Sequence, residues 1–355
     1  MSTALAFIFV LGVLIFIHEL GHFLVAKWMG VRVERFSLGF PPNILSRKWG
    51  DTTYSIGIIP LGGFVKMAGD NPAEGVTGAP DEFHSKSVSQ RAAVIFAGPA
   101  MNYVLAIVIL SSIYMFYGRP IVDQDRIVVG EVSPEAPAAE AGLQADDMII
   151  GVDGEPVSQF DSLRERINVR INEPVEVTWV SQGDTITKTI TTTTTAIPTA
   201  EGTLDTVGII GFSQKVQGYE RYGIFEAVGE GFVMTHVMVA QTVKFVKMLV
   251  TGQVSTKMIG GPVFIAQQSG REARKGAGSL FLFMALLSVN LAIINVLPIP
   301  ILDGGHLVFL GVEKIRGRRL SVKALARAQQ VGMIVLLTLI VFVTYNDILR
   351  VLRGN

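Results

Sequence analysis

Two histidines and a glutamate stand close together in the stretch FIHELGHF, directly after an apolar run near the N-terminus. In a helix, His18 and His22 are four residues apart and therefore share one face, about one turn from each other. Their ring nitrogens can then reach one metal ion at about 2.0–2.1 Å, while Glu19 lies beside the ion without binding it. The pattern is typical of a zinc site whose glutamate serves as a general base.

The alternative for these residues is a pair of histidines hydrogen-bonded inside a helical bundle, which would be ordinary for a single histidine. Three ionisable residues in one membrane-length segment are harder to explain in this way. Each costs about 3 kcal/mol in the apolar core of a bilayer, and such residues mark functional sites. We therefore interpret the triplet as part of a metal site.

A catalytic zinc ion has three protein ligands and an open position for water. The predicted third ligand is Asp303, a charged residue at the end of the apolar stretch in NVLPIPILDGGH. Its alternative role is to cap the glycine turn that follows it. His306 competes for the ligand role, but it lies further along the chain.

Pro298 and Pro300 interrupt the helical pattern just before this aspartate. Irregular backbone at membrane depth is tolerated only where protein or a water-filled cavity surrounds it, so we expect a hydrated pocket at the metal. Asn295 precedes the break. Its amide either contacts a substrate or forms a hydrogen bond between helices.

The composition indicates a membrane protein. Of the 355 residues, 49% are hydrophobic and only 17% are charged, against about a quarter in soluble domains. The net charge is zero, which gives no argument for a nucleic-acid partner. The absence of cysteine excludes disulfides and thiolate metal ligands.

Four stretches are long and apolar enough to cross a bilayer, which takes about 20 residues: 2–26, 92–118, 276–302 and 328–346. A fifth stretch, 231–250, contains two lysines, and we expect it to lie at the membrane interface as an amphipathic helix. Basic residues gather in the connections 27–91 and 303–327, which predicts that both are cytoplasmic. The two termini and residues 119–276 then lie on the outer side.

The outer segment has the pattern of a small α+β module, with short strands and two helices. Its stretch SPEAPAAEAGLQADDMIIGVDGEPV resembles a PDZ domain of the circularly permuted bacterial kind. In that arrangement the strand and loop that bind a peptide carboxylate fall on five consecutive residues: Gly208, Ile209, Ile210, Gly211 and Phe212.

Four motifs in this order, HELGH, PLGGFVKMAGD, FAGPAMN and NVLPIPILDGGH, resemble the site-2 protease family of intramembrane zinc metalloproteases. Within that family, the resemblance is closest to the group of the bacterial regulator of sigma-E protease, and it covers nearly the whole chain. It implies one zinc ion held by His18, His22 and Asp303, with Glu19 as the base and Asn295 in contact with the substrate. The chain departs from the best-studied members by having room for one PDZ domain instead of two.

The resemblance also implies that the segment 52–67, TTYSIGIIPLGGFVKM, forms a re-entrant β-hairpin in the membrane. Such a hairpin can bind an unwound substrate by strand addition. The predicted substrate-binding residues there are Ile56, Gly57, Ile58, Gly62 and Gly63. The alternative is an ordinary cytoplasmic hairpin.

The sequence therefore predicts a multi-pass α-helical membrane protein with four transmembrane helices, an inserted PDZ-like α+β domain and a membrane-associated β-hairpin. The expected divisions are 1–118 for the first two spans, 119–215 for the PDZ-like domain, 216–275 for interfacial helices and 276–355 for the last two spans. The family implies the bacterial inner membrane as the location.

The expected function is proteolysis of single-span membrane proteins within their transmembrane segments, for example an anti-sigma factor or a leftover signal peptide. An upstream site-1-type protease would make the first cut in the same substrate. Two other classes use similar features. A metal transporter would need a polar path on both sides of the metal, and 4–17, the first half of the first span, has no polar residue. A membrane scaffold would have no use for a glutamate beside the metal.

Overall fold

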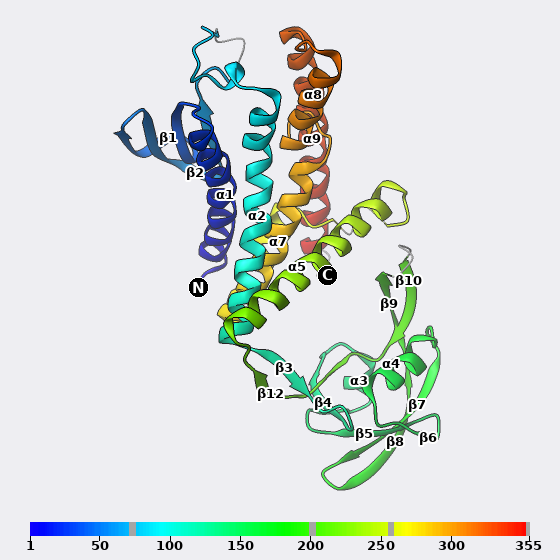
Figure 1. The fold of residues 1–355 in the computed structure, drawn as a ribbon. Helices are drawn as coiled ribbons and strands as arrows, with labels where there is room; N and C mark the ends of the chain where they lie inside the picture. Colours follow the sequence, from blue (N-terminus) through cyan, green and yellow to red (C-terminus); the bar gives the residue numbers. More distant parts are fainter. Residues whose placement is uncertain (71–75, 199–203, 255–258, 353–355) are drawn as a thin grey trace. The chain divides into compact units, whose positions relative to one another are not determined.

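The computed structural model describes residues 1–70, 76–198, 204–254 and 259–352. The chain forms two compact units (Figure 1). The first comprises 1–113, 224–243 and 255–355, and the second comprises 114–223 and 244–254. Each unit is described by itself.

The first unit is a bundle of helices with a small sheet. Its helices are α1 (Thr3–Trp28), α2 (Val88–Phe116), the first part of α5 (Ile224–Val250), α6 (Pro262–Lys275), α7 (Ala277–Val296), α8 (Asp303–Arg316) and α9 (Val322–Leu352). A short 3-10 turn, η2, covers Phe83–Ser85. The predicted break after the third apolar stretch is confirmed, because α7 ends at Val296 and α8 begins at Asp303.

Five helices among the described residues are long and apolar enough to cross a membrane: α1, α2, α5, α7 and α9. The prediction of a multi-pass membrane protein agrees with this, but the count exceeds the predicted four by α5. An 18-residue stretch of α5 has a mean hydropathy of 1.3, against 2.0 to 2.3 for such stretches of the other four helices. Polar contacts join α5 to the bundle, from His236 to the Tyr103 hydroxyl at 3.1 Å and from the Thr242 hydroxyl to Asn290 at 2.8 Å.

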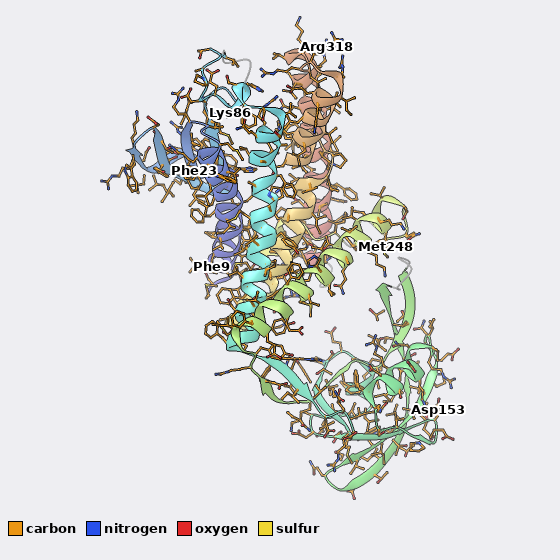
Figure 2. The ribbon with its side chains drawn as sticks, in the orientation of Figure 1. Phe9, Phe23, Lys86, Asp153, Met248 and Arg318 are labelled. Carbon is orange, nitrogen blue, oxygen red and sulfur yellow. The ribbon has the colours of Figure 1, made fainter. Side chains whose placement is uncertain are left out.

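Close packing joins α1, α2 and α7. Val10 and Leu14 of α1 meet Leu110 of α2 and Met284 and Val289 of α7 in one apolar cluster, and all five side chains are almost fully buried. The outward faces of these helices remain apolar and exposed, as with Phe9 (Figure 2). That combination is expected of helices whose outer solvent is lipid.

At one end of the bundle, α6 contacts both ends of the chain. The Asp347 carboxylate near the end of α9 accepts hydrogen bonds from the backbone N–H groups of Gly261 and Phe264, at the start of α6. Gly270 of α6 packs directly against Thr3 at the start of α1. Helix α6 therefore connects the start of α1 to the end of α9.

The small sheet is made of β1 (Val33–Trp49) and β2 (Thr52–Met67), joined by a tight turn at 50–51. Both strands are long and bent. The segment 35–38 of β1 pairs with 53–56 and also with 63–66, while 43–49 pairs with 52–57. The order across the sheet is therefore 43–49, 52–57, 33–38 and 63–67, with 63–67 at an edge.

This arrangement corrects the predicted hairpin. The two arms of 52–67 do not pair with each other, because residues 33–38 lie between them. The reason is packing: Val33 and Phe36 are buried, and Phe36 contacts Phe16 and Phe23 of α1 at ring distances of 5.9 and 5.3 Å (Phe23 is labelled in Figure 2). Gly39, with φ +81°, then permits the bend that frees the rest of β1 to pair elsewhere.

The second unit is an α+β module. Its strands are β3 (Arg119–Val122), β4 (Ile127–Val132), β5 (Met148–Val152), β6 (Glu155–Pro156), β7 (Pro174–Ser181), β8 (Asp184–Thr191), β9 (Thr193–Pro198), β10 (Leu204–Ile209), β11 (Phe212–Gln214) and β12 (Val216–Glu220). The main sheet has the order β11-β4-β5-β7-β8, and β6 pairs with β5. Two helices, α3 (Pro137–Glu140) and α4 (Phe160–Asn168), complete it. Trp179, Ile149 and Leu163 are almost fully buried at its centre.

Candidate active site

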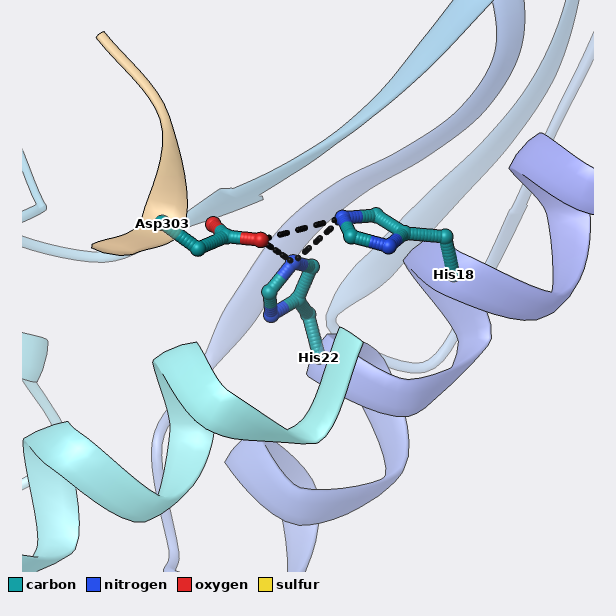
Figure 3. Close-up of side chains that lie close together, drawn as sticks. All are labelled: His18, His22 and Asp303. Atoms are coloured by element: carbon teal, nitrogen blue, oxygen red, sulfur yellow. Dashed lines mark hydrogen bonds and ion pairs between the residues drawn. The ribbon is translucent and has the colours of Figure 1, made fainter. Parts of the chain in front are cut away.

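The three predicted metal ligands converge on one point (Figure 3). His18 and His22 project from successive turns of α1, and their Nε2 atoms are 3.2 Å apart. The Oδ2 atom of Asp303, the first residue of α8, lies 3.1 Å from Nε2 of His18 and 3.5 Å from Nε2 of His22. Residues almost 300 positions apart in the chain thus form one compact cluster.

The geometry of this cluster fits a zinc ion. Ligand atoms at about 2.0–2.1 Å from a tetrahedral centre are about 3.3–3.4 Å from one another, and the three distances here are 3.1, 3.2 and 3.5 Å. The Oδ2 atom of Asp303 is buried, and apart from the two imidazoles no described residue offers it a hydrogen bond. Two imidazoles and one carboxylate are a donor set that zinc takes in catalytic sites.

Both histidines are held through their second ring nitrogen. Nδ1 of His22 lies 2.9 Å from the backbone carbonyl of Val94, and Nδ1 of His18 lies 3.1 Å from the side-chain amide of Asn102. Both partners belong to α2. Contacts of this kind fix the ring orientation and the tautomer of a metal-binding histidine.

A glycine of α2 lies directly against the two rings. A Cβ atom added to Gly98 would be 2.4 Å from Nε2 of His22 and 2.8 Å from Nε2 of His18. Only a residue without a side chain leaves room for this approach. The motif FAGPAMN contains both Gly98 and Asn102, but the sequence alone predicts a role for neither, because their use depends on how α2 packs on α1.

Glu19 lies beside the cluster without belonging to it. Its carboxylate is within hydrogen-bonding reach of the Val65 backbone N–H. A Cβ added to Gly63 would be 3.2 Å from its Cγ atom. The edge segment 63–67 of β2 therefore lies next to the predicted base.

A cavity of about 980 Å³ opens at this point. Its lining includes the three residues of the HELGH motif, Asp303, and the predicted substrate-binding residues Gly63 and Asn295. His306 also lines it but is not among the converging ligands. The predicted Ile56, Gly57, Ile58 and Gly62 do not line it among the described residues, and the Ile56 and Ile58 side chains are exposed.

Comparison with known proteins identifies the chain. Residues 6–339 match the profile of peptidase family M50. The chain belongs to this family. A putative zinc metalloprotease of Agrobacterium fabrum is 38% identical, over 96% of this chain and 94% of that protein. The zinc metalloprotease RasP of Geobacillus kaustophilus is 29% identical, over 98% of each chain. These matches confirm the resemblance to a family of zinc metalloproteases and the prediction that the chain is a peptidase.

A solved PDZ domain of an SdrC-like protein from Listeria monocytogenes aligns with 26% of this M50 peptidase and 92% of its own chain, at 21% identity and a TM-score of 0.21. A score this low carries no argument about the fold, so the PDZ assignment stays a prediction.

The five predicted peptide-binding residues of the second unit run from the end of β10 to the first residue of β11. Gly208 and Ile209 end β10, and Phe212 begins β11. Ile210 is buried in the core, and its carbonyl accepts a hydrogen bond from the Ala138 N–H. The ring of Phe212 meets Phe160, the first residue of α4, edge-on at 5.8 Å.

Charged residues also line the cavity away from the three candidate metal ligands. The Arg91 guanidinium donates to Glu313, and this hydrogen bond holds the pKa of Glu313 below its usual value. His84 also lines the cavity, and burial lowers the pKa of its imidazole. Neither ring nitrogen of His84 has a hydrogen-bond partner among the described residues.

Proposed function

We propose that this M50 peptidase is an intramembrane zinc metalloprotease that cleaves single-span membrane proteins within their transmembrane segments. One zinc ion is held by His18, His22 and Asp303. The observation that carries the proposal is the convergence of these three ligand atoms beside Glu19, inside a unit whose long helices are apolar on their outer faces.

In the proposed hydrolysis, the zinc ion and the side chains of the protein have different roles. When bound, zinc lowers the pKa of a coordinated water to about 7 and polarises a peptide carbonyl. Glu19 takes the proton of the attacking water and delivers it to the leaving nitrogen. Asn295, which lines the same cavity, donates its amide to a carbonyl of the substrate backbone.

The substrate needs partners for its backbone. A transmembrane helix hides its amides in its own hydrogen bonds, so the bond to be cut becomes accessible only after local unwinding. We propose that the unwound segment adds as a strand to the edge segment 63–67 of β2. The pairing of 63–67 on one side only, and its place in the cavity lining, support this choice. The segment 52–57 is paired on both sides and leaves no such edge.

Four membrane crossings agree with the contacts of the site. The contact of His22 with Val94 joins the end of α1 to the start of α2, and Asp303 brings the end of α7 to the same level. The start of α7 is then at the end of the bundle where α2 finishes. If α5 crossed the membrane, the 14-residue α6 would be too short to bring the chain back. We therefore propose that α5 enters the membrane without crossing it.

We propose the bacterial inner membrane as the location, with the metal site towards the cytoplasm. Lys86 and Arg318 lie at the same end of the bundle (Figure 2), and the connections that contain them are rich in basic residues, which favours the cytoplasmic side. The termini and residues 119–215 are then on the outer side.

We further propose that residues 119–215 act as a PDZ-like selector. A folded outer module that excludes substrates with bulky outer domains would restrict the protease to membrane proteins already cut by another protease. Deleting the module should then allow cleavage of untrimmed substrates. Unchanged selectivity in a stable deletion variant would contradict this role.

The proposed activity is tested with the purified full-length protein and a single-span substrate in detergent. Cleavage should stop with a zinc chelator and return when zinc is added back. Metal-dependent cleavage separates a protease from a transporter or a scaffold, neither of which would cut the substrate. Cleavage that persists after complete removal of zinc would reject the proposal.

A further inference from the structure

The side chain of Asn102 is fully buried in α2, between the metal site and α7. Its amide lies 3.1 Å from Nδ1 of His18, and its backbone carbonyl accepts a hydrogen bond from the Ser288 hydroxyl at 2.7 Å. Its Oδ1 atom is also buried and has no hydrogen-bond partner among the described residues. A buried amide without its partners is costly, so this group calls for an explanation.

The chemistry of a bound histidine provides one. A histidine that binds a metal through Nε2 carries its proton on Nδ1 and must donate it. The two ends of an asparagine amide have the same shape, and their assignment follows the hydrogen bonds that they make. With its oxygen towards His18, Asn102 accepts the Nδ1 proton, and its amide nitrogen then takes the other buried position.

The two zinc-binding histidines differ in how they are held. His22 donates to the backbone carbonyl of Val94, a contact that no side-chain substitution removes. The orientation of His18 depends on a side chain. A helix-to-helix hydrogen bond without influence on the metal is the structural alternative for Asn102. That alternative predicts lower stability but unchanged metal affinity.

We propose that Asn102 is a positioning residue, which accepts the Nδ1 proton of His18 and thereby presents Nε2 to the zinc ion. The inference rests on the proposed zinc site. It concerns a residue that never touches the metal or the substrate, and it explains why a fully buried amide is placed at membrane depth beside the HELGH motif.

The test is a zinc affinity, measured on purified full-length variants by competition with a chromophoric chelator. Asn102→Leu, nearly the same size but without polar atoms, should weaken zinc binding about 10- to 100-fold, and Asn102→Ala should do the same. Asn102→Asp keeps an oxygen that accepts the Nδ1 proton and should bind zinc at least as tightly as the parent. The visible spectrum of the cobalt-substituted protein should change in Asn102→Leu.

Ser288→Ala is the matched control, because it removes the hydrogen bond to the backbone of Asn102 and leaves the amide in place. Its zinc affinity should stay close to that of the parent. The inference is overturned if both Asn102→Leu and Asn102→Ala bind zinc like the parent, or if Ser288→Ala weakens binding equally. In those cases His18→Ala would still lose zinc, and the proposed metal site would stand. A parent protein that binds no zinc would instead overturn the proposed function.

Discussion

The guanidinium of Arg91 on α2 donates two hydrogen bonds, at 3.0 and 2.6 Å, to the carboxylate of Glu313 on α8. The Arg91 side chain is 3% exposed and that of Glu313 is 14% exposed. Helix α8 begins with the proposed metal ligand Asp303, so this pair fixes the other end of the helix that carries it. The arrangement of the site therefore depends on an ion pair about ten residues away from it.

Removing one partner of this pair should be strongly destabilising. Glu313→Leu leaves the charge of the buried Arg91 without its partner, which costs about 3–5 kcal/mol of unfolding free energy. Arg91→Met should cost less, because Arg319 lies 3.4 Å from the Glu313 carboxylate and still pairs with it. The double variant should lose less than the sum of the two, because no unpaired charge remains. Unfolding in a series of denaturing detergent concentrations measures the unfolding free energy of the parent and of each variant. The exposed pair Arg32–Asp81 is the control, and breaking it should cost under about 1 kcal/mol. Single variants that lose no more than this control would contradict the prediction.

The same pair predicts how stability depends on pH. The pKa of Glu313 lies below the usual 4.5, chiefly because of the hydrogen bond from Arg91. Its contribution to stability is therefore fully present above pH 4.5 and is lost as the pH falls through the lowered value. The stability difference between the parent and Glu313→Gln should be constant near neutral pH and should shrink only in acid. A difference that already shrinks between pH 7 and 6 would refute this.

A methyl group at position 98 should damage the metal site. The Cβ of Gly98→Ala would overlap Nε2 of both His18 and His22, so we expect weak or absent zinc binding with the helices retained. Gly12→Ala in α1 is the matched control, because its Cβ meets no described atom within 4 Å. Metal analysis measures the zinc content, and circular dichroism measures the helix content. Equal zinc content in the two variants would show that the close approach has no importance.

Strand addition of the substrate can be followed by cross-linking, because the chain contains no cysteine. A single cysteine at Phe64, in the inactive Glu19→Gln background, should form disulfides with cysteines at every second position of the substrate segment, the period of a strand. Ile58→Cys, outside the cavity lining, should form few. A period of three to four residues would mean that the substrate stays helical at this site.

The three side chains that converge at the proposed metal site could be picked out from the sequence because charged residues are conspicuous in apolar stretches. His18 and His22 follow from helical spacing, and Asp303 follows from its place after a helix break. Asn102 and Gly98 could not be assigned in this way, since a polar or small residue within an apolar helix has no meaning until the neighbouring helix is known.

The pairing of β1 with β2 could not be predicted from the sequence either. The segment 52–67 was correctly predicted as β-structure, but its pairing depends on residues 33–38, which pack on α1 through Phe36. Strand pairing is a property of tertiary contacts, whereas the family resemblance implied a local hairpin. The edge segment 63–67 beside Glu19 could therefore be identified only from the folded structure.

The central claim is that Glu19 is a base and His18 is a ligand, and one experiment separates these roles: zinc content and substrate cleavage measured on the same preparations of Glu19→Gln and His18→Ala. We predict that Glu19→Gln retains zinc near the level of the parent and loses at least about 100-fold in cleavage rate, whereas His18→Ala loses both. Cleavage at the parental rate in zinc-loaded Glu19→Gln, or full zinc occupancy in His18→Ala, would contradict the account.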